Sequence, residues 1–325
     1  MTVLVCGGAG YIGSHMVRLL QAQGEEVVVF DNLSTGHACA LPGGVELVKG
    51  DLLDSGALAC VFERFNFDAV VHFAAYSQVG ESMSAPYKYY SNNVVGTLNL
   101  LDAMRSASVK RIVFSSTAAV YGNPLRSPID EGHPTAPINP YGASKLMVER
   151  ILADGAVAYG LRSVSLRYFN AAGAETSGCI GESHEPETHL IPNILKAALG
   201  NGARLKIFGQ DYPTPDGTCV RDYVHVLDLG VAHLQALSFL QSHSGAHVFN
   251  LGNGSGFSVK EVLDAALRVT GRSIPFDAAP RRAGDPPMLV ASSDRARAEL
   301  GWEPQHSALD GIIADAWRWH QRASY

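Results

Sequence analysis

The sequence predicts an α/β protein in which a doubly wound parallel sheet is followed by a smaller C-terminal α/β lobe. Two observations lead to this class. Apolar, β-rich runs alternate with longer segments that have room for helices, and after Arg167 this rhythm gives way to loops rich in Gly, Pro, Asp and Glu. With 325 residues, 46% of them hydrophobic and 17% charged, the chain can bury a sizeable core.

Six short runs predict the strands of the sheet. They span residues 2–6, 26–30, 45–48, 69–73, 111–115 and 163–168. An amphipathic helix is expected over residues 11–23, and further helices over about 88–107 and around 139–150. The order of strands and helices is typical of a parallel sheet whose crossover helices cover both faces.

The second lobe is predicted from the later loops and helices. Ser258 and Glu261 have the spacing of a capping box, and Gly271 suits the end of the helix expected over 258–270. A tail helix through Trp317 and Trp319 is explained most simply by packing. We therefore expect a first domain of residues 1–169, to which 223–252 return, and a second lobe of residues 170–222 and 253–325.

Composition excludes several classes of function. The net charge of −6 and the absence of a basic tract give no electrostatic footprint for nucleic acid. No charged leader precedes the first apolar run and no apolar stretch is long enough to cross a bilayer, so no membrane association and a cytoplasmic location are expected.

No metal is expected either. The five cysteines are scattered, without the spacing of a disulfide framework or a zinc site. His225 and the pair His243 and His247 could suggest a metal, but the pair straddles a turn without a third ligand. Structural roles are therefore favoured for these histidines.

A glycine-rich turn indicates the first ligand. The run Gly7-Gly8-Ala9-Gly10-Tyr11-Ile12-Gly13 joins the first predicted strand to the first helix, as in Rossmann-type dinucleotide-binding domains. Such a turn brings backbone N–H groups and a helix N-terminus against a pyrophosphate. The second strand ends in Asp31-Asn32, where a carboxylate can accept the ribose hydroxyls, and no arginine lies nearby in sequence for a 2′-phosphate. The predicted cofactor is NAD.

A tyrosine and a lysine indicate chemistry. Tyr141 and Lys145 are four residues apart on a predicted helix, so the ammonium can lie near the phenol and favour its ionised form. A phenolate is a base. The strand before this helix ends in Ser115-Ser116-Thr117, which places hydroxyl groups at the carboxyl end of a parallel strand, where such sheets bind ligands.

At these residues the chain resembles the extended short-chain dehydrogenase/reductase superfamily, and within it the UDP-galactose 4-epimerases. The resemblance covers essentially the whole chain. It rests on the segments GGAGYIGSH, VVVFDNLSTG, HFAA…VGES, YYSNNVVGTLNLL, YGASKLMVE, LRYFNAAGA, IFGQDYPTPDGTCVRDYVHVLDL and PRRAGDPP.

The resemblance implies roles for individual residues. Tyr141 would take the proton of the sugar 4-hydroxyl while hydride passes from C4 to the nicotinamide, which leaves a 4-keto sugar; Lys145 would tune the phenol and hold the nicotinamide ribose. Thr117 would share the sugar proton, as the third catalytic residue. The cofactor positions are Gly7, Gly10, Tyr11, Ile12, Gly13, Asp31, Asn32, Asp51, Leu52, Phe73, Ala74, Ala75, Asn92, Tyr141, Lys145 and Phe169.

The resemblance also implies the substrate, UDP-glucose or UDP-galactose, and a homodimer formed through the helix with Tyr141 and the helix before it. The substrate positions are Thr117, Asn170, His189, Leu190, Arg221, Arg282, Asp285 and Leu289. Leu289 would lie beside the C2 substituent of the sugar, where it would disfavour N-acetylated substrates without excluding them.

Three alternatives remain open. The substrate could be another UDP-sugar, an N-acetylhexosamine or a pentose. A nucleotide-sugar dehydratase needs a further acid and base after the strand-end Thr117, where this chain has Ala118 and Ala119. A non-catalytic NAD-binding protein would have no need of Tyr141 and Lys145, both of which are present.

Overall fold

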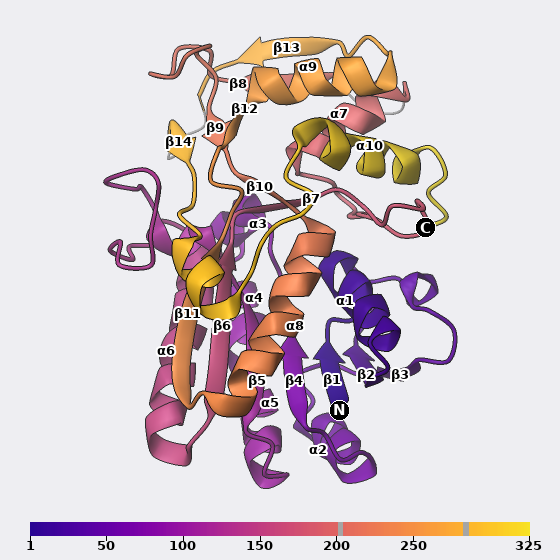
Figure 1. The fold of residues 1–325 in the computed structure, drawn as a ribbon, viewed down its shortest axis with the longest axis vertical. Coiled ribbons are helices and arrows are strands. Elements are labelled where there is room, and N and C mark those ends of the chain that lie inside the picture. Colours follow the sequence, from indigo (N-terminus) through magenta and orange to yellow (C-terminus); the bar gives the residue numbers. More distant parts are fainter. Residues whose placement is uncertain (201–203, 282–285) are drawn as a thin grey trace.

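The computed structural model describes residues 1–200, 204–281 and 286–325. A large α/β domain is joined to a smaller lobe that lies across one end of it (Figure 1). The predicted fold class is confirmed. Among the described residues, no helix is long and apolar enough to cross a membrane.

Seven parallel strands form the central sheet in the order β11-β6-β5-β4-β1-β2-β3. The first strand lies inside the sheet, and the chain winds outwards from it in both directions, which is the doubly wound arrangement. The strands are β1 (Thr2–Cys6), β2 (Glu26–Asp31), β3 (Glu46–Lys49), β4 (Ala69–His72), β5 (Arg111–Thr117), β6 (Arg162–Tyr168) and β11 (Gly245–Leu251).

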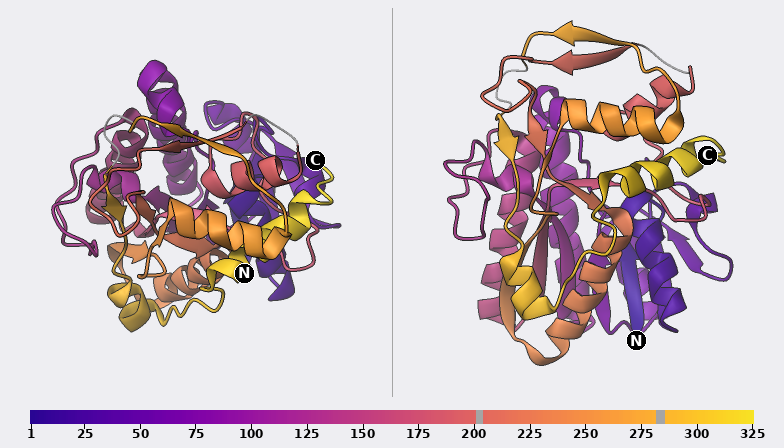
Figure 2. Two further views of the ribbon diagram at one scale, coloured as in Figure 1. Left: turned by 90° about the horizontal axis from the view of Figure 1, so that it is seen from above. Right: turned by 45° about the horizontal axis from the view of Figure 1, so that its top comes forward.

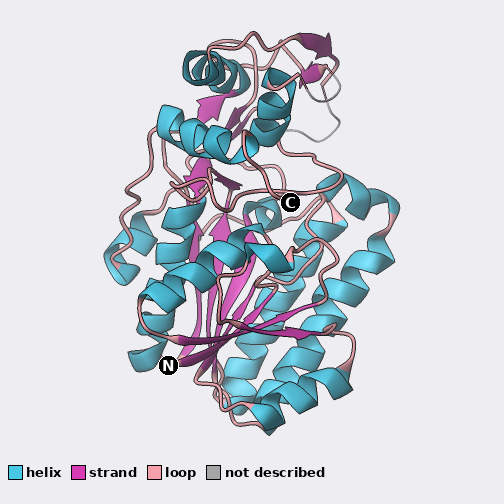
Figure 3. Cartoon of the chain, turned by 90° about the vertical axis from the view of Figure 1, so that its right-hand side faces the viewer, coloured by secondary structure: helices cyan, strands magenta, loops and turns pink. Residues whose placement is uncertain are grey.

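Helices cover both faces of this sheet (Figure 3). On one face, α1 (Tyr11–Ala22) and α8 (Val226–Ser242) pack their apolar side chains on the strands. On the other face the cover comes from α2 (Ser55–Arg64), α5 (Gly96–Ser106) and α6 (Pro140–Tyr159). Each face therefore has its own hydrophobic core, which explains why the central strands are apolar on both sides.

The small lobe has a third core, formed by three helices at the top of the molecule (Figure 2, right). They are α7 (Leu190–Ala198), α9 (Val259–Thr270) and α10 (Leu309–His320). Its short strands are β7 (Asn170–Ala172), β8 (Leu205–Phe208), β9 (Val220–Arg221), β10 (Tyr223–His225), β12 (Phe257–Ser258), β13 (Phe276–Ala279) and β14 (Met288–Leu289). The predicted capping box is present: Ser258 caps α9 with Glu261, and Gly271 ends the helix in the left-handed conformation.

Some elements differ from their sequence-based expectation. The helix expected over 88–107 is composed of α4 (Pro86–Tyr89), a π-helical stretch (Tyr90–Val95) and α5. Two residues of the expected second lobe, Ala296 and Trp302, are buried in the core of the large sheet instead. The reason is a tertiary contact, since the Trp302 indole donates a hydrogen bond of 2.9 Å to the Asp228 carbonyl of α8.

Candidate active site

A cavity of about 1240 Å³ lies where the strands of the large sheet end and the small lobe begins. Its floor is formed by residues that follow the carboxyl ends of β1, β2, β4, β5 and β6, which are neighbours in the sheet. Open parallel sheets bind ligands at this edge, because the strand order reverses there and the connecting helices diverge.

The glycine turn after β1 packs directly against neighbouring backbone, with no room for side chains. A Cβ atom on Gly7 would lie 2.5 Å from the backbone nitrogen of Ala74, and one on Gly13 would lie 2.1 Å from the Gly7 carbonyl. Helix α1 starts directly after Gly10, and no side chain caps its first turn. The first N–H groups of α1 therefore remain available to a pyrophosphate at the helix N-terminus.

The carboxylate at the end of β2 is held in place by backbone groups. Asp31 accepts hydrogen bonds of 2.9 Å from the N–H of Ala9 and 2.8 Å from that of Leu33. Burial raises the pKa of Asp31, although the two hydrogen bonds oppose the rise. Beside it, Asn32 donates 2.9 Å to Asp51. These groups and the glycine turn fit the adenosine half of NAD.

The π-helical stretch is joined to the helix that contains Tyr141. Asn93 accepts hydrogen bonds from the backbone N–H of Tyr76 and from the side chain of Asn92, each 2.9 Å long. It also donates 3.0 Å to the hydroxyl of Ser144 on α6. The extra residue in this turn therefore places Asn92 on the cavity and Asn93 between two elements, and π-bulges often serve functional sites in this way.

Tyr141 lies in the first turn of α6, which Asn139 caps by accepting a 2.8 Å hydrogen bond from the N–H of Gly142. The phenol is hydrogen-bonded to Thr117 at the end of β5. Burial raises the pKa of Tyr141, while the hydrogen bond with Thr117 acts to lower it. The sequence-based expectation that Lys145 tunes this phenol stays a prediction.

The ammonium of Lys145 is held by residues of β5. Its Nζ atom donates a 2.8 Å hydrogen bond to the carbonyl of Ser115 and lies over the ring of Phe114, 4.8 Å from the centroid. Burial lowers the pKa of Lys145 to about 7, against the charge of Glu149, which raises it. The ammonium of Lys145 therefore interacts with Ser115, Phe114 and Glu149 below the cavity, and not with the phenol of Tyr141 alone.

A buried ion pair supports this floor. Glu149 of α6 accepts a 2.5 Å hydrogen bond from Ser116 and a bidentate pair from Arg167 of β6, with distances of 2.9 and 2.5 Å. Arg167 also donates 2.9 Å to the hydroxyl of Tyr121. The pair joins α6 to β5 and β6, the strands that carry Thr117 and Ser115, and so fixes the helix with Tyr141 on the sheet.

The small lobe supplies the other wall of the cavity. The side chain of Asn170 donates 2.8 Å to the Asp222 carbonyl, and Arg221 donates 3.0 Å to the Pro286 carbonyl. Leu289 is paired with Arg221 in the β9–β14 ladder and packs near the cluster around Ala118. Beside Thr117, Ala118 and Ala119 also line the cavity.

The structure brings most of the predicted residues to one cavity. All sixteen expected cofactor positions line it, together with Thr117, Asn170, His189, Arg221 and Leu289. Leu190 does not, because its side chain packs against the core of the small lobe. Arg282 and Asp285 lie outside the described residues.

Sequence reasoning missed several residues of the cavity wall. Two sets of residues received no role, Ser34, Thr35 and Gly36 after β2, which lie in a quoted segment, and Gln78 after β4, which lies between two quoted stretches. A third group, Glu182, His184 and Glu185, lies in the loop before α7. The acid-rich composition of that loop was the only sequence signal for it.

The chain is similar to proteins of one family over nearly its whole length. The model of the NAD dependent epimerase/dehydratase family matches residues 3–252. The UDP-glucose 4-epimerase of Halalkalibacterium halodurans is 53% identical over 321 residues, which are 99% of this chain and 96% of that protein. The UDP-glucose 4-epimerase of Rhizobium meliloti is 52% identical over 320 residues, 98% of this chain and 97% of that protein.

Solved structures give the same result. The UDP-glucose 4-epimerase of Brucella ovis in complex with NAD is 51% identical, with a TM-score of 0.94 over 98% of both chains. That of Stenotrophomonas maltophila, with bound NAD and a formylated UDP-arabinopyranose, is 42% identical, with a TM-score of 0.96 over 100% of this chain and 99% of that one. The chain belongs to the NAD-dependent epimerase/dehydratase family.

Proposed function

We propose that the protein is an NAD-dependent UDP-glucose 4-epimerase, which interconverts UDP-glucose and UDP-galactose through a transient 4-keto sugar. The observation that carries this proposal is the grouping of Tyr141, Thr117 and Lys145 at one end of a cavity whose other end fits a dinucleotide. When bound, NAD supplies a hydride acceptor and donor at C4 and is regenerated in each turnover.

In this proposal Tyr141 is the general base for the sugar 4-hydroxyl. Thr117, hydrogen-bonded to the phenol, orients it and stabilises its ionised form, which acts to lower the pKa of Tyr141. Lys145 stands on the same face of α6 and is anchored to the Ser115 carbonyl. A protonated Lys145 there adds positive charge to the site and can reach a ribose hydroxyl.

The sixteen cofactor positions would hold NAD; the first turn of α1 would bind the pyrophosphate and Asp31 the adenosine ribose. The sugar nucleotide lies against the small lobe. Asn170 and Arg221 face it from β7 and β9, and Arg221 offers a guanidinium to the diphosphate. Ala118 and Ala119 have no proton to transfer, which favours epimerisation over a dehydratase reaction.

Leu289 sets how broad the substrate range is. It faces the cavity from β14 and leaves more room than a tyrosine would, but less than a small residue. We propose that UDP-glucose and UDP-galactose are preferred, and that UDP-N-acetylgalactosamine is converted more slowly. The 43% identical structure of the UDP-Glc/GlcNAc 4-epimerase from Campylobacter jejuni shows that a related chain acts on both classes.

We further propose a homodimer in the cytoplasm. Several apolar side chains are exposed on the helices expected at the interface, Tyr87 at 85%, Leu98 at 41% and Met147 at 46%. A contiguous group of exposed apolar side chains would mark a contact surface. Each of the five thiols, all within the described residues, is free, as suits a reducing compartment. Residues 170–222 and 253–325 are proposed as the sugar-nucleotide lobe, except for the stretch with Ala296 and Trp302.

The test is to incubate the protein and NAD with UDP-galactose and to separate the products by chromatography. UDP-glucose should accumulate to an equilibrium without a lasting rise in NADH absorbance. Tyr141→Phe should lose turnover by several orders of magnitude and still retain NAD, measured by cofactor fluorescence. A near-normal rate in this variant refutes its role as the base, and lasting NADH production refutes the epimerase reaction.

A further inference from the structure

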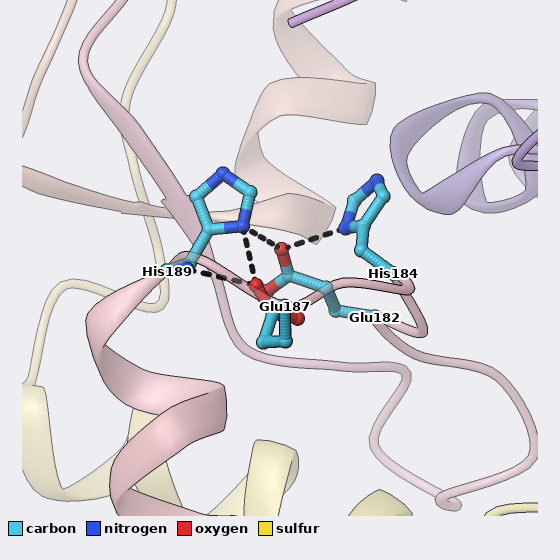
Figure 4. A group of neighbouring side chains, drawn as sticks. All are labelled: Glu182, His184, Glu187 and His189. Atoms are coloured by element: carbon cyan, nitrogen blue, oxygen red, sulfur yellow. Dashed lines mark hydrogen bonds and ion pairs between the residues drawn. The ribbon is translucent and has the colours of Figure 1, made fainter. Parts of the chain in front are cut away.

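A group of four potential metal ligands lies on the cavity wall, in the loop between β7 and α7 (Figure 4). The group consists of Glu182, His184, Glu187 and His189, and one nitrogen or oxygen atom of each lies within 4.8 Å of the other three. His189 Nδ1 is 2.8 Å from a carboxylate oxygen of Glu182 and 2.8 Å from one of Glu187. His184 Nδ1 is 3.1 Å from Glu182.

One carboxylate oxygen in this cluster is buried without a partner. The side chain of Glu187 is only 3% exposed. Its Oε1 atom accepts hydrogen bonds of 2.7 and 2.8 Å from the backbone N–H groups of Thr188 and His189, whereas Oε2 has no hydrogen-bond partner. Figure 4 shows the other oxygen of this carboxylate beside the imidazole of His189. A buried carboxylate oxygen without a donor or cation is costly, so the arrangement indicates a missing ligand.

The cluster is electronegative. Two carboxylates, those of Glu182 and Glu187, lie against the single imidazole of His189, each at 2.8 Å. Both carboxylates are nearly buried, with 7% of the Glu182 side chain exposed. Two anions in a poorly solvated place attract positive charge, and a divalent cation supplies more of it than one proton on an imidazole.

The backbone holds these ligands in position before any ion binds. The carbonyl of Glu182 accepts a 2.9 Å hydrogen bond from the indole of Trp319, which is 1% exposed. A Cβ atom on the preceding residue, Gly181, would lie 2.4 Å from that ring, so loop and helix are packed closely. At the other end His189 is the N-cap of α7. Loop and helix together limit how far the donors can move.

We propose that Glu182, His184, Glu187 and His189 form a binding site for one zinc ion. Imidazole nitrogen and carboxylate oxygen are both zinc ligands, at about 2.0–2.2 Å, and four of them complete a tetrahedron. The edge of such a tetrahedron is about 3.4 Å; three of the observed separations are 2.8 to 3.1 Å and all lie within 4.8 Å, so the donors must shift to close around the ion. Magnesium and calcium, by contrast, prefer oxygen ligands alone.

Four protein donors leave no open position, so the ion is structural. It joins the first part of the loop to the start of α7 and fixes the wall of the cavity that faces the sugar nucleotide. Ions that bind only the folded state stabilise it by mass action. The proposal does not depend on the epimerase reaction, and its test needs no substrate.

The experiment uses the untagged, full-length chain after treatment with a chelator. Zinc alone is titrated by calorimetry, and cobalt is added separately, because tetrahedral cobalt gives a visible absorption band that reports the geometry. We expect one ion per chain and a higher melting temperature with zinc. Glu187→Gln keeps the shape of the side chain and should weaken binding at least about tenfold, as His184→Asn should.

The matched control is the double variant His243→Asn with His247→Asn. These two imidazoles have ring centroids 6.3 Å apart and lie at the end of α8 and in β11, away from the cluster. Their loss should leave zinc binding unchanged, and circular dichroism of each metal-free variant checks its fold. The proposal is overturned if zinc does not bind saturably, if both cluster variants bind it as tightly as the native chain, or if the control abolishes binding.

Discussion

Replacing Glu149 by glutamine tests whether the buried ion pair under the active site fixes α6 on the sheet. The side chains of Arg167 and Glu149 are 7% and 6% exposed and are joined by two hydrogen bonds. Glu149→Gln leaves the guanidinium buried without its anion, which costs about 3–5 kcal/mol of the free energy of unfolding. The same helix carries an internal control, Arg150 and Asp154, whose side chains are 79% and 63% exposed. Asp154→Asn should cost less than about 1 kcal/mol.

Urea unfolding of the two variants and the native chain, followed by circular dichroism, measures the difference. We also expect the double variant Glu149→Met with Arg167→Met to lie much closer to the native chain than Glu149→Gln, because an apolar pair leaves no buried charge unpaired. The reasoning is refuted if Glu149→Gln is no more destabilising than Asp154→Asn, or if the double variant is the least stable of all.

The remaining predictions concern pH, specificity, cofactor binding and capping. Glu149 raises the pKa of Lys145, so Glu149→Gln should lower it below about 7 and move the alkaline limb of the rate profile to lower pH; an unmoved limb contradicts this link. Leu289→Tyr should abolish activity on UDP-N-acetylgalactosamine and spare UDP-galactose in kcat/KM measurements, and equal losses would place Leu289 away from the C2 group. Gly13→Ala should weaken NAD binding in fluorescence titrations, because the new Cβ would meet the Gly7 carbonyl at 2.1 Å; native affinity contradicts this. Ser258→Ala should cost about 1 kcal/mol in urea unfolding through the lost N-cap of α9, and no change would mean that the cap is dispensable.

The sequence was sufficient for the fold and for much of the candidate site, because both depend on local patterns. The glycine turn, the strand-end Asp31 and the Tyr141–Lys145 pair are each defined within a few residues. The parallel sheet then brings the ends of neighbouring strands to one edge, so motifs far apart in sequence converge on one cavity. Expectations that depend only on strand position, such as Thr117 beside Tyr141, follow from this rule.

Expectations that depend on side-chain direction were less secure. Helical spacing alone places Lys145 near Tyr141, but its ammonium donates a hydrogen bond to the carbonyl of Ser115 on another element. Leu190 follows His189 directly, yet it packs into the small lobe, since successive residues at the start of a helix point in different directions. The position of Trp302 in the large core is likewise set by a contact with α8, which is far away in sequence.

The sequence by itself determined the strands and helices, the turn that fits a dinucleotide and the pair of residues expected to perform the chemistry, because periodicity, glycine placement and capping act over short distances. Only the tertiary structure decided the charge state of buried groups and the cluster of Glu182, His184, Glu187 and His189. Burial sets the charge state of these groups, because the loss of solvation lowers the pKa of Lys145. The cluster forms because one loop folds against Trp319 and α7, and the spacing of residues along the chain does not specify that fold.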